Sequence, residues 1–154
     1  LTRSFEVPLL INDDVDLAVA VAADGVHLGH EDSDPEEARA RLPAECLIGL
    51  SCYNRFDLAE QAVAHGADYV AFGSFFTSPT KPQAVRAEAQ LLQRARLELG
   101  VPTVAIGGIS PENGAALVAA GADMLAVISA VFAADDVTAA TKAFVSCFAP
   151  AQGD

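Results

Sequence analysis

The chain of 154 residues is poor in cysteine, in basic residues and in long apolar runs. Its three cysteines, Cys46, Cys52 and Cys147, are odd in number and lack CxxC spacing, which argues against a disulfide framework or a zinc site. We expect each to be a reduced, small core residue rather than a nucleophile. No apolar run approaches the roughly 20 residues that span a bilayer, and no signal peptide pattern opens the sequence. We therefore expect a cytoplasmic protein that has no membrane partner.

Basic residues are outnumbered, because 9 Lys and Arg residues stand against 21 Asp and Glu residues, a net charge of −12. Such a surface repels phosphate backbones and anionic lipids, so we expect no nucleic acid partner. A phosphate ligand must then be held by local groups or through a metal. The composition, 52% hydrophobic and 19% charged, is typical of a globular protein. The length suits one domain over residues 1–154.

Short apolar runs alternate with helical patterns, several of which end at a glycine. A Gly-Ala-Asp or Ala-Asp-Gly triplet introduces three of the strands, which suggests a repeated unit. This alternation predicts a parallel sheet and favours a TIM (β/α)8-type barrel of which six βα units are present. The predicted strands are 7–11, 25–28, 47–50, 68–72, 101–106 and 124–128, and the predicted helices are 14–23, 35–42, 55–65, 86–99, 111–120 and 137–148.

Polar residues follow the predicted strands, where the chemistry of parallel α/β folds is found. Asp13 and Asp32 come after two successive strands and are oxygen donors of the kind that Mg²⁺ uses. Helix capping is the alternative for these residues and for Asp14. His27 and His30 are candidates for a metal ligand or a general base, although a histidine on a half-buried strand is more often simply hydrogen-bonded.

The stretch DYVAFGSFFTSPTK predicts a buried strand followed by a polar loop. Ser78, Thr80 and Lys81 can bind anionic oxygens, and Pro79 holds the shape of the loop. An ordinary βα loop is the alternative. Further along, Gly107-Gly108 can admit a ligand to the backbone or form a tight turn. Ser129 opens a short helix whose N-terminus suits a phosphate.

The ordered set PLLIND, GVHLGHED, IGLS, SPTK, AIGGI and AVISA resembles the thiamine-phosphate synthase family of TIM-barrel enzymes. The resemblance runs from about Val7 to Val131. It implies a transferase that joins a hydroxymethylpyrimidine diphosphate to a thiazole phosphate and releases pyrophosphate. It also implies that Mg²⁺ is bound by Asp13 and Asp32. The pyrimidine diphosphate would be held by Asn12, Ser51 and Lys81, with Ser51 and Lys81 as catalytic residues, and the thiazole phosphate by Ser78, Pro79, Thr80, Gly108, Ile128 and Ser129.

The sequence departs from the family pattern in three places. His30 stands where glutamine is usual after HLG, and Thr77-Ser78 stands where a Pro-Thr pair is usual. The first two βα units of the family, including a pyrimidine-gripping Gln-x-Arg-x-Lys stretch, are not in the sequence. We therefore expect that an N-terminal segment or another copy in a homo-oligomer completes the barrel. The alternatives are a thiazole tautomerase-like enzyme, which does not use the paired aspartates, and a non-catalytic phosphate-binding remnant.

Overall fold

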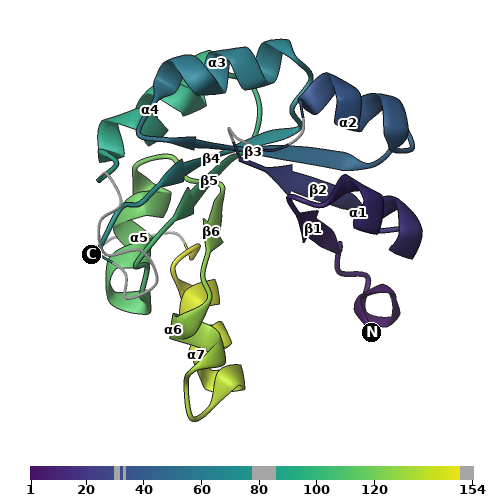
Figure 1. The fold of residues 1–154 in the computed structure, drawn as a ribbon. Helices are drawn as coiled ribbons and strands as arrows, with labels where there is room; N and C mark the ends of the chain where they lie inside the picture. The colour runs from purple at the N-terminus through teal and green to yellow at the C-terminus, as the bar shows by residue number, and fades with distance from the viewer. Residues whose placement is uncertain (30–31, 33, 78–85, 150–154) are drawn as a thin grey trace.

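Strands and helices alternate along the chain, as the sequence predicts (Figure 1). The computed structural model describes residues 1–29, 32, 34–77 and 86–149. The strands are β1 (Leu10–Asn12), β2 (Gly25–Leu28), β3 (Leu47–Tyr53), β4 (Tyr69–Gly73), β5 (Thr103–Ile106) and β6 (Met124–Ala126). After a 3-10 turn, η1 (Thr2–Phe5), the helices are α1 (Val15–Val21), α2 (Pro35–Arg41), α3 (Phe56–Ala64), α4 (Ala89–Glu98), α5 (Pro111–Ala119), α6 (Ser129–Phe132) and α7 (Val137–Ser146). None of the helices in the described part of the chain has the length and apolarity needed to cross a bilayer.

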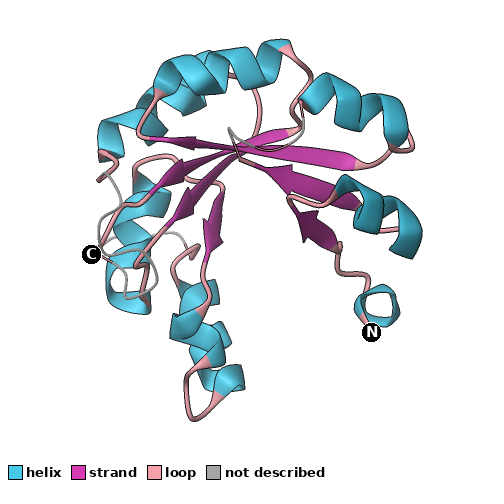
Figure 2. Ribbon diagram, viewed as in Figure 1, coloured by secondary structure: helices cyan, strands magenta, loops and turns pink. Residues whose placement is uncertain are grey.

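The strands form one parallel sheet in the order β1-β2-β3-β4-β5-β6. Strands that follow one another in sequence are neighbours in the sheet, so each helical connection returns the chain to the start of the adjacent strand. Figure 2 shows that the sheet curls and that helices cover its outer side. This is the architecture of a TIM-type barrel with six βα units, which confirms the predicted fold class.

The two faces of each strand carry different residues, because side chains alternate along a strand. In β2, Val26 and Leu28 are fully buried in the outer core, whereas His27 between them faces the inner side and is half-buried. The outer core forms two clusters, one over β1–β3 and the other over β3–β6, and Leu50 packs against both. The inner face is therefore the side on which polar residues can act.

All three cysteines are buried and unpaired. Burial raises the pKa of the Cys52 thiol to about 12. Because only the thiolate is a good nucleophile, this confirms the prediction of small core residues and leaves no reactive thiol at Cys52.

The repeated aspartate before β2, β4 and β6 links each of these strands to the one before it. Its carboxylate accepts a hydrogen bond from a backbone N–H at or next to the start of the preceding strand. The backbone N–H of the aspartate donates in turn to the carbonyl of the residue whose N–H its carboxylate accepts. We call these contacts the aspartate clamps; their carboxylate–amide distances are 2.7 Å for Asp24–Leu9, 2.7 Å for Asp68–Ile48 and 2.8 Å for Asp123–Thr103.

The predicted boundaries fail at both edge strands for local reasons, and β3 runs to Tyr53 rather than ending at residue 50. β1 begins at Leu10 rather than Val7, because the Val7 N–H bonds to η1, Pro8 has no N–H and the Leu9 backbone belongs to a clamp. β6 ends at Ala126 rather than Ile128. Its partner β5 ends opposite Ala126, and the next residue, Gly107, turns away with φ 101°.

Strands β1 and β6 are the edges of the sheet within the part of the chain that the structure describes. In Figure 1 they lie at the two ends of the curl, with a gap between them. The sheet is thus an open part of a barrel, because a complete barrel closes on itself with eight strands.

The clamps predict a measurable contribution to stability. Asp123→Ala leaves the N–H of the fully buried Thr103 without its carboxylate acceptor, so we expect the free energy of unfolding to fall by about 1–3 kcal/mol. Denaturant unfolding of the full-length protein measures this. The control is Asp135→Ala in the exposed turn before α7, which we expect to change stability by less than about 0.5 kcal/mol. Equal stability of the two variants would contradict the clamp.

Candidate active site

The predicted site residues that the structure describes lie at one edge of the sheet, because parallel strands bring their carboxyl ends together. Each βα unit contributes there from the end of its strand or from the loop that follows. From β1 to β6 the contributions are Asn12 with Asp13, Asp32, Ser51, residues 74–77, Gly107 with Gly108, and Ile128 with Ser129.

Asp13 and Asp14 have different roles although they are neighbours. The Asp14 carboxylate accepts the Leu17 N–H at 2.8 Å and caps α1, which settles the capping alternative for this residue. Asp13 lies before the helix with φ 63°, and its N–H donates to the His27 carbonyl at 2.9 Å. The Asn12 side-chain amide donates to the Asp13 carboxylate at 2.6 Å. Asp13 is therefore held at the end of β1 and does not cap α1.

Asp32 is likewise not the cap of the next helix, because Asp34 caps α2 through the Glu36 N–H at 2.8 Å. The exposed Asp32 carboxylate accepts the Gly29 N–H at 2.6 Å. Burial lowers the pKa of His27, and the Asp32 carboxylate opposes that shift through its charge. Asp13 therefore contacts His27 through a backbone hydrogen bond, and Asp32 acts on the His27 ring through the charge of its carboxylate. His30 lies outside the described residues.

The pair fits a metal ion that keeps water and ligand oxygens. Both carboxylates are exposed and come from adjacent strand ends. Among the described residues no group of three or more His, Cys, Asp or Glu side chains gathers to hold a metal. A metal ion held by only two protein carboxylates has further coordination positions for water and ligand oxygens. This suits Mg²⁺, which usually retains several waters and binds substrate phosphates.

Ser51 is hydrogen-bonded within the inner face of the sheet. Its hydroxyl lies 2.8 Å from Nε2 of His27, and Nδ1 of the same ring lies 2.9 Å from the Tyr69 hydroxyl. The two rings stack with centroids 5.6 Å apart. Burial also raises the pKa of Tyr69 to about 12, so the phenol is protonated at neutral pH. The hydrogen-bonded interpretation of His27 is confirmed.

Tyr69 was not predicted as a site residue, since a tyrosine in an apolar strand resembles core. The available signal is Gly49, which pairs with Tyr69 in the sheet. A Cβ at Gly49 would lie 1.9 Å from Cζ of Tyr69, so the glycine provides the space that the ring occupies. A glycine inside a strand beside an aromatic residue indicates such a close approach.

The two glycines after β5 have a packing role. Both have left-handed φ, 101° for Gly107 and 62° for Gly108. A Cβ at Gly108 would lie 2.7 Å and 2.6 Å from the carbonyl oxygens of Phe76 and Thr77. The Phe76 N–H donates to the Gly107 carbonyl at 3.0 Å. The tight-turn alternative is therefore present, and ligand binding by Gly108 stays a prediction.

The predicted phosphate loop, Ser78, Pro79, Thr80 and Lys81, lies outside the described residues, but the chain on either side of it is placed. The Ala87 N–H donates to the Ser74 carbonyl at 2.8 Å, and Nε of Arg86 donates to the Phe75 carbonyl at 3.1 Å. The chain therefore leaves and re-enters the described structure at the carboxyl end of β4, beside Gly107 and Gly108.

Ile128 and Ser129 lie at the corresponding point after β6. Ile128 is 67% exposed, and its carbonyl accepts the N–H groups of Val131 and Phe132. Ser129 is exposed and begins α6. The structure thus places both residues at the carboxyl edge, while their contact with a phosphate stays a prediction.

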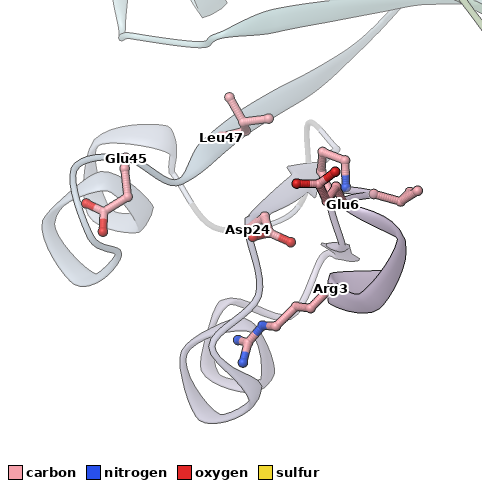
Figure 3. Close-up of a pocket in the computed structure, with 7 residues that line it drawn as sticks. Arg3, Glu6, Asp24, Glu45 and Leu47 are labelled. Carbon is pink, nitrogen blue, oxygen red and sulfur yellow. The ribbon is translucent and has the colours of Figure 1, made fainter. Parts of the chain in front are cut away.

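A cavity of about 470 Å³ lies near the opposite, amino end of the sheet. Figure 3 shows Arg3, Glu6, Asp24, Glu45 and Leu47 around it. Asp24 and Leu47 lie at the entry to β2 and the start of β3, so this hollow is separate from the site residues. Its volume alone does not make it the active site, because catalytic groups of this architecture lie at the carboxyl ends of strands.

The close approach at Gly108 predicts a specific effect on stability. Gly108→Ala combines a left-handed φ with a clash against two carbonyl oxygens, whereas Gly100→Ala has φ 68° and nothing within 4 Å. We expect Gly100→Ala to lower the unfolding free energy by about 1–2 kcal/mol and Gly108→Ala by more. Denaturant titration of both variants measures the difference, and equal losses would show that the loops are not in contact.

Comparison with known proteins gives one consistent family. The family profile described as thiamine monophosphate synthase matches residues 1–131. The thiamine-phosphate synthase of Azoarcus sp. (strain BH72) is 59% identical over 149 residues, which are 97% of this chain and 72% of the relative. Those of Methylobacillus flagellatus and Nitrosospira multiformis are 54% and 51% identical, and the match covers 70% and 63% of their lengths.

Solved structures agree with the sequence relatives. The thiamine phosphate pyrophosphorylase of Pyrococcus furiosus superposes with a TM-score of 0.83 at 38% identity, over 95% of this chain and 69% of that one. A 3-hexulose-6-phosphate synthase superposes with a TM-score of 0.75 at 19% identity, which shows a shared fold alone. The chain therefore belongs to the thiamine-phosphate synthase family and is a transferase of thiamine biosynthesis.

Proposed function

We propose that the carboxyl edge of this sheet condenses a hydroxymethylpyrimidine diphosphate with a thiazole phosphate. The bond between the pyrimidine methylene carbon and the diphosphate oxygen breaks, and its electron pair leaves with pyrophosphate. The thiazole nitrogen lone pair then forms the new carbon–nitrogen bond, which gives thiamine phosphate. No protein nucleophile is required for this reaction.

The observation that carries the proposal is the position of His27. Its carbonyl accepts the Asp13 N–H, its ring lies within the electrostatic reach of Asp32, and its Nε2 is 2.8 Å from the Ser51 hydroxyl. One residue thus connects the two aspartates to the serine that we assign to the pyrimidine diphosphate. A metal ion and a diphosphate bound by these groups would be adjacent.

We assign the diphosphate to the half of the edge formed by β1–β4. Asp13 and Asp32 would hold Mg²⁺, and Asn12, Ser51 and Lys81 would contact the pyrimidine diphosphate. When bound, Mg²⁺ supplies positive charge to the departing oxygens. Ser51 offers a hydroxyl and Lys81 a cation to the same oxygens, which stabilises the charge that develops as pyrophosphate leaves.

We assign the thiazole phosphate to the half formed by the loops after β4, β5 and β6. The contacts that join the 74–77 segment to Gly107 and Gly108 support a shared pocket there. Two phosphate sites side by side would hold the thiazole nitrogen against the reacting carbon, which is catalysis by proximity. The assigned residues are Ser78, Pro79, Thr80, Gly108, Ile128 and Ser129.

We further propose that an N-terminal segment or a second copy pairs with β1 and β6 to close the barrel. Unpaired parallel edges expose backbone N–H and C=O groups, which proteins usually cover. The relatives support this in length, since the match covers 63–72% of the first three. We also propose a cytoplasmic location, because three unpaired cysteines suit a reducing compartment.

The neighbouring aspartates provide a matched test of the proposed metal site. In the full-length protein we expect Asp13→Asn to lower kcat/KM about 100-fold and to raise the Mg²⁺ concentration needed for half activity. Asp14→Asn should stay within about threefold of wild type, because asparagine caps a helix as well as aspartate does. Steady-state assays across a Mg²⁺ titration measure both. Full turnover of Asp13→Asn, or of the wild type in EDTA, would contradict the proposed metal site.

A further inference from the structure

Three polar side chains from three neighbouring strands form a continuous hydrogen-bonded chain on the inner face. Tyr69 of β4 contacts Nδ1 of His27 in β2 at 2.9 Å, and Nε2 of His27 contacts Ser51 of β3 at 2.8 Å. Tyr69 of β4 therefore reaches across β3 to His27 of β2, and the other ring nitrogen of His27 contacts Ser51 on β3. The function proposed above assigns no substrate contact to Tyr69 or His27, yet His27 contacts Ser51 directly and Tyr69 contacts Ser51 through His27.

The direction of these hydrogen bonds is set by the tautomer of His27, because a neutral imidazole carries its hydrogen on one of its two ring nitrogens. The protonated Tyr69 phenol has one O–H, and His27 Nδ1 is the acceptor that the described structure provides for it. In the tautomer with Nδ1 unprotonated, the phenol donates to that nitrogen and its half-buried O–H is satisfied. Nδ1 then accepts and carries no hydrogen, so the ring hydrogen of His27 is on Nε2. From there it is donated to the Ser51 oxygen.

This direction decides what Ser51 can do. Because its oxygen accepts from His27, its own hydrogen is left to donate to a group outside the chain of three. In the opposite tautomer, Ser51 would donate to Nε2 and face a substrate oxygen with lone pairs only. Anionic diphosphate oxygens require a donor, so only the first arrangement favours binding.

We propose that Tyr69 is a positioning residue that acts through His27 to keep the Ser51 hydroxyl a hydrogen-bond donor to the pyrimidine diphosphate. This inference rests on the proposed function, which assigns Ser51 to that substrate. The close fit of the ring over Gly49 supports it, since a Cβ there would displace Tyr69 by contact at 1.9 Å. The ring is thereby held where the Tyr69 hydroxyl meets Nδ1 of His27.

A double-mutant cycle in the full-length protein tests the proposal. We expect Tyr69→Phe to raise the KM for the pyrimidine diphosphate about tenfold while the KM for the thiazole phosphate stays unchanged. Ser51→Ala should raise the same KM at least as much. The double variant should match Ser51→Ala, because Tyr69 has no further effect once the serine hydroxyl is gone. Thermal melting of each variant checks that it is folded.

A second pair of variants tests the same hydrogen bond without changing Tyr69. His27→Gln keeps a side-chain N–H that can donate to Ser51, whereas His27→Leu has similar bulk and no donor. We expect His27→Gln to bind the pyrimidine diphosphate more tightly than His27→Leu, although both lose the ring stacking on Tyr69. If His27 had a merely structural role, His27→Gln would not bind the pyrimidine diphosphate more tightly than His27→Leu.

The outcomes distinguish the inference from the function on which it rests. A wild-type KM for Tyr69→Phe beside a raised KM for Ser51→Ala would overturn the positioning role and leave the proposed function intact. Independent, multiplying effects of the two substitutions would overturn it as well. A wild-type KM for Ser51→Ala would overturn both the assignment of Ser51 and the inference. Equal affinities of His27→Gln and His27→Leu would also contradict the inference.

Discussion

Parallel pairing of consecutive strands is the constraint on which the rest of the structure depends. Because all six strands run in one direction, their carboxyl ends share an edge and residues far apart in the chain become neighbours. The aspartate clamps fix the other end, where Asp24, Asp68 and Asp123 each bind the backbone of the preceding strand. Register set at the amino end determines which side chains meet at the carboxyl end, so the clamps and the site belong to one arrangement.

The elements were predictable where local chemistry decides them. Gly25–Leu28 is a strand with the predicted limits, because Val26 and Leu28 are apolar and a repeat triplet that ends at Gly25 introduces it. Other limits were predicted less well, including the end of the central strand β3 at Tyr53. At the edges, Val7 and Ile128 are apolar but their backbone groups are used by a turn and a helix cap. The spacing of apolar residues indicates which side chains are buried, whereas the limits of a strand depend on where a neighbouring strand pairs with its backbone.

The site was predictable in its placement but not in its connections. Asp13 and Ser51 are at the carboxyl edge because they end or follow strands. The sequence does not show that Asp14 caps a helix while Asp13 does not. Gly49 indicates that a ring approaches β3 closely, but it does not show that Tyr69 reaches His27. These are contacts between strands, and they depend on twist and register that one sequence does not display.

The central claim is the proposal that His27 joins Asp13, Asp32 and Ser51 in a single site for Mg²⁺ and the diphosphate. The most direct measurement is a crystal structure of the full-length protein with Mn²⁺ and the pyrimidine diphosphate, in which anomalous scattering locates the manganese. The account predicts a peak bound by Asp13 and Asp32, with a diphosphate oxygen within hydrogen-bonding distance of the Ser51 hydroxyl. A manganese peak away from both aspartates, or a diphosphate bound at the amino end beside Arg3, would contradict it.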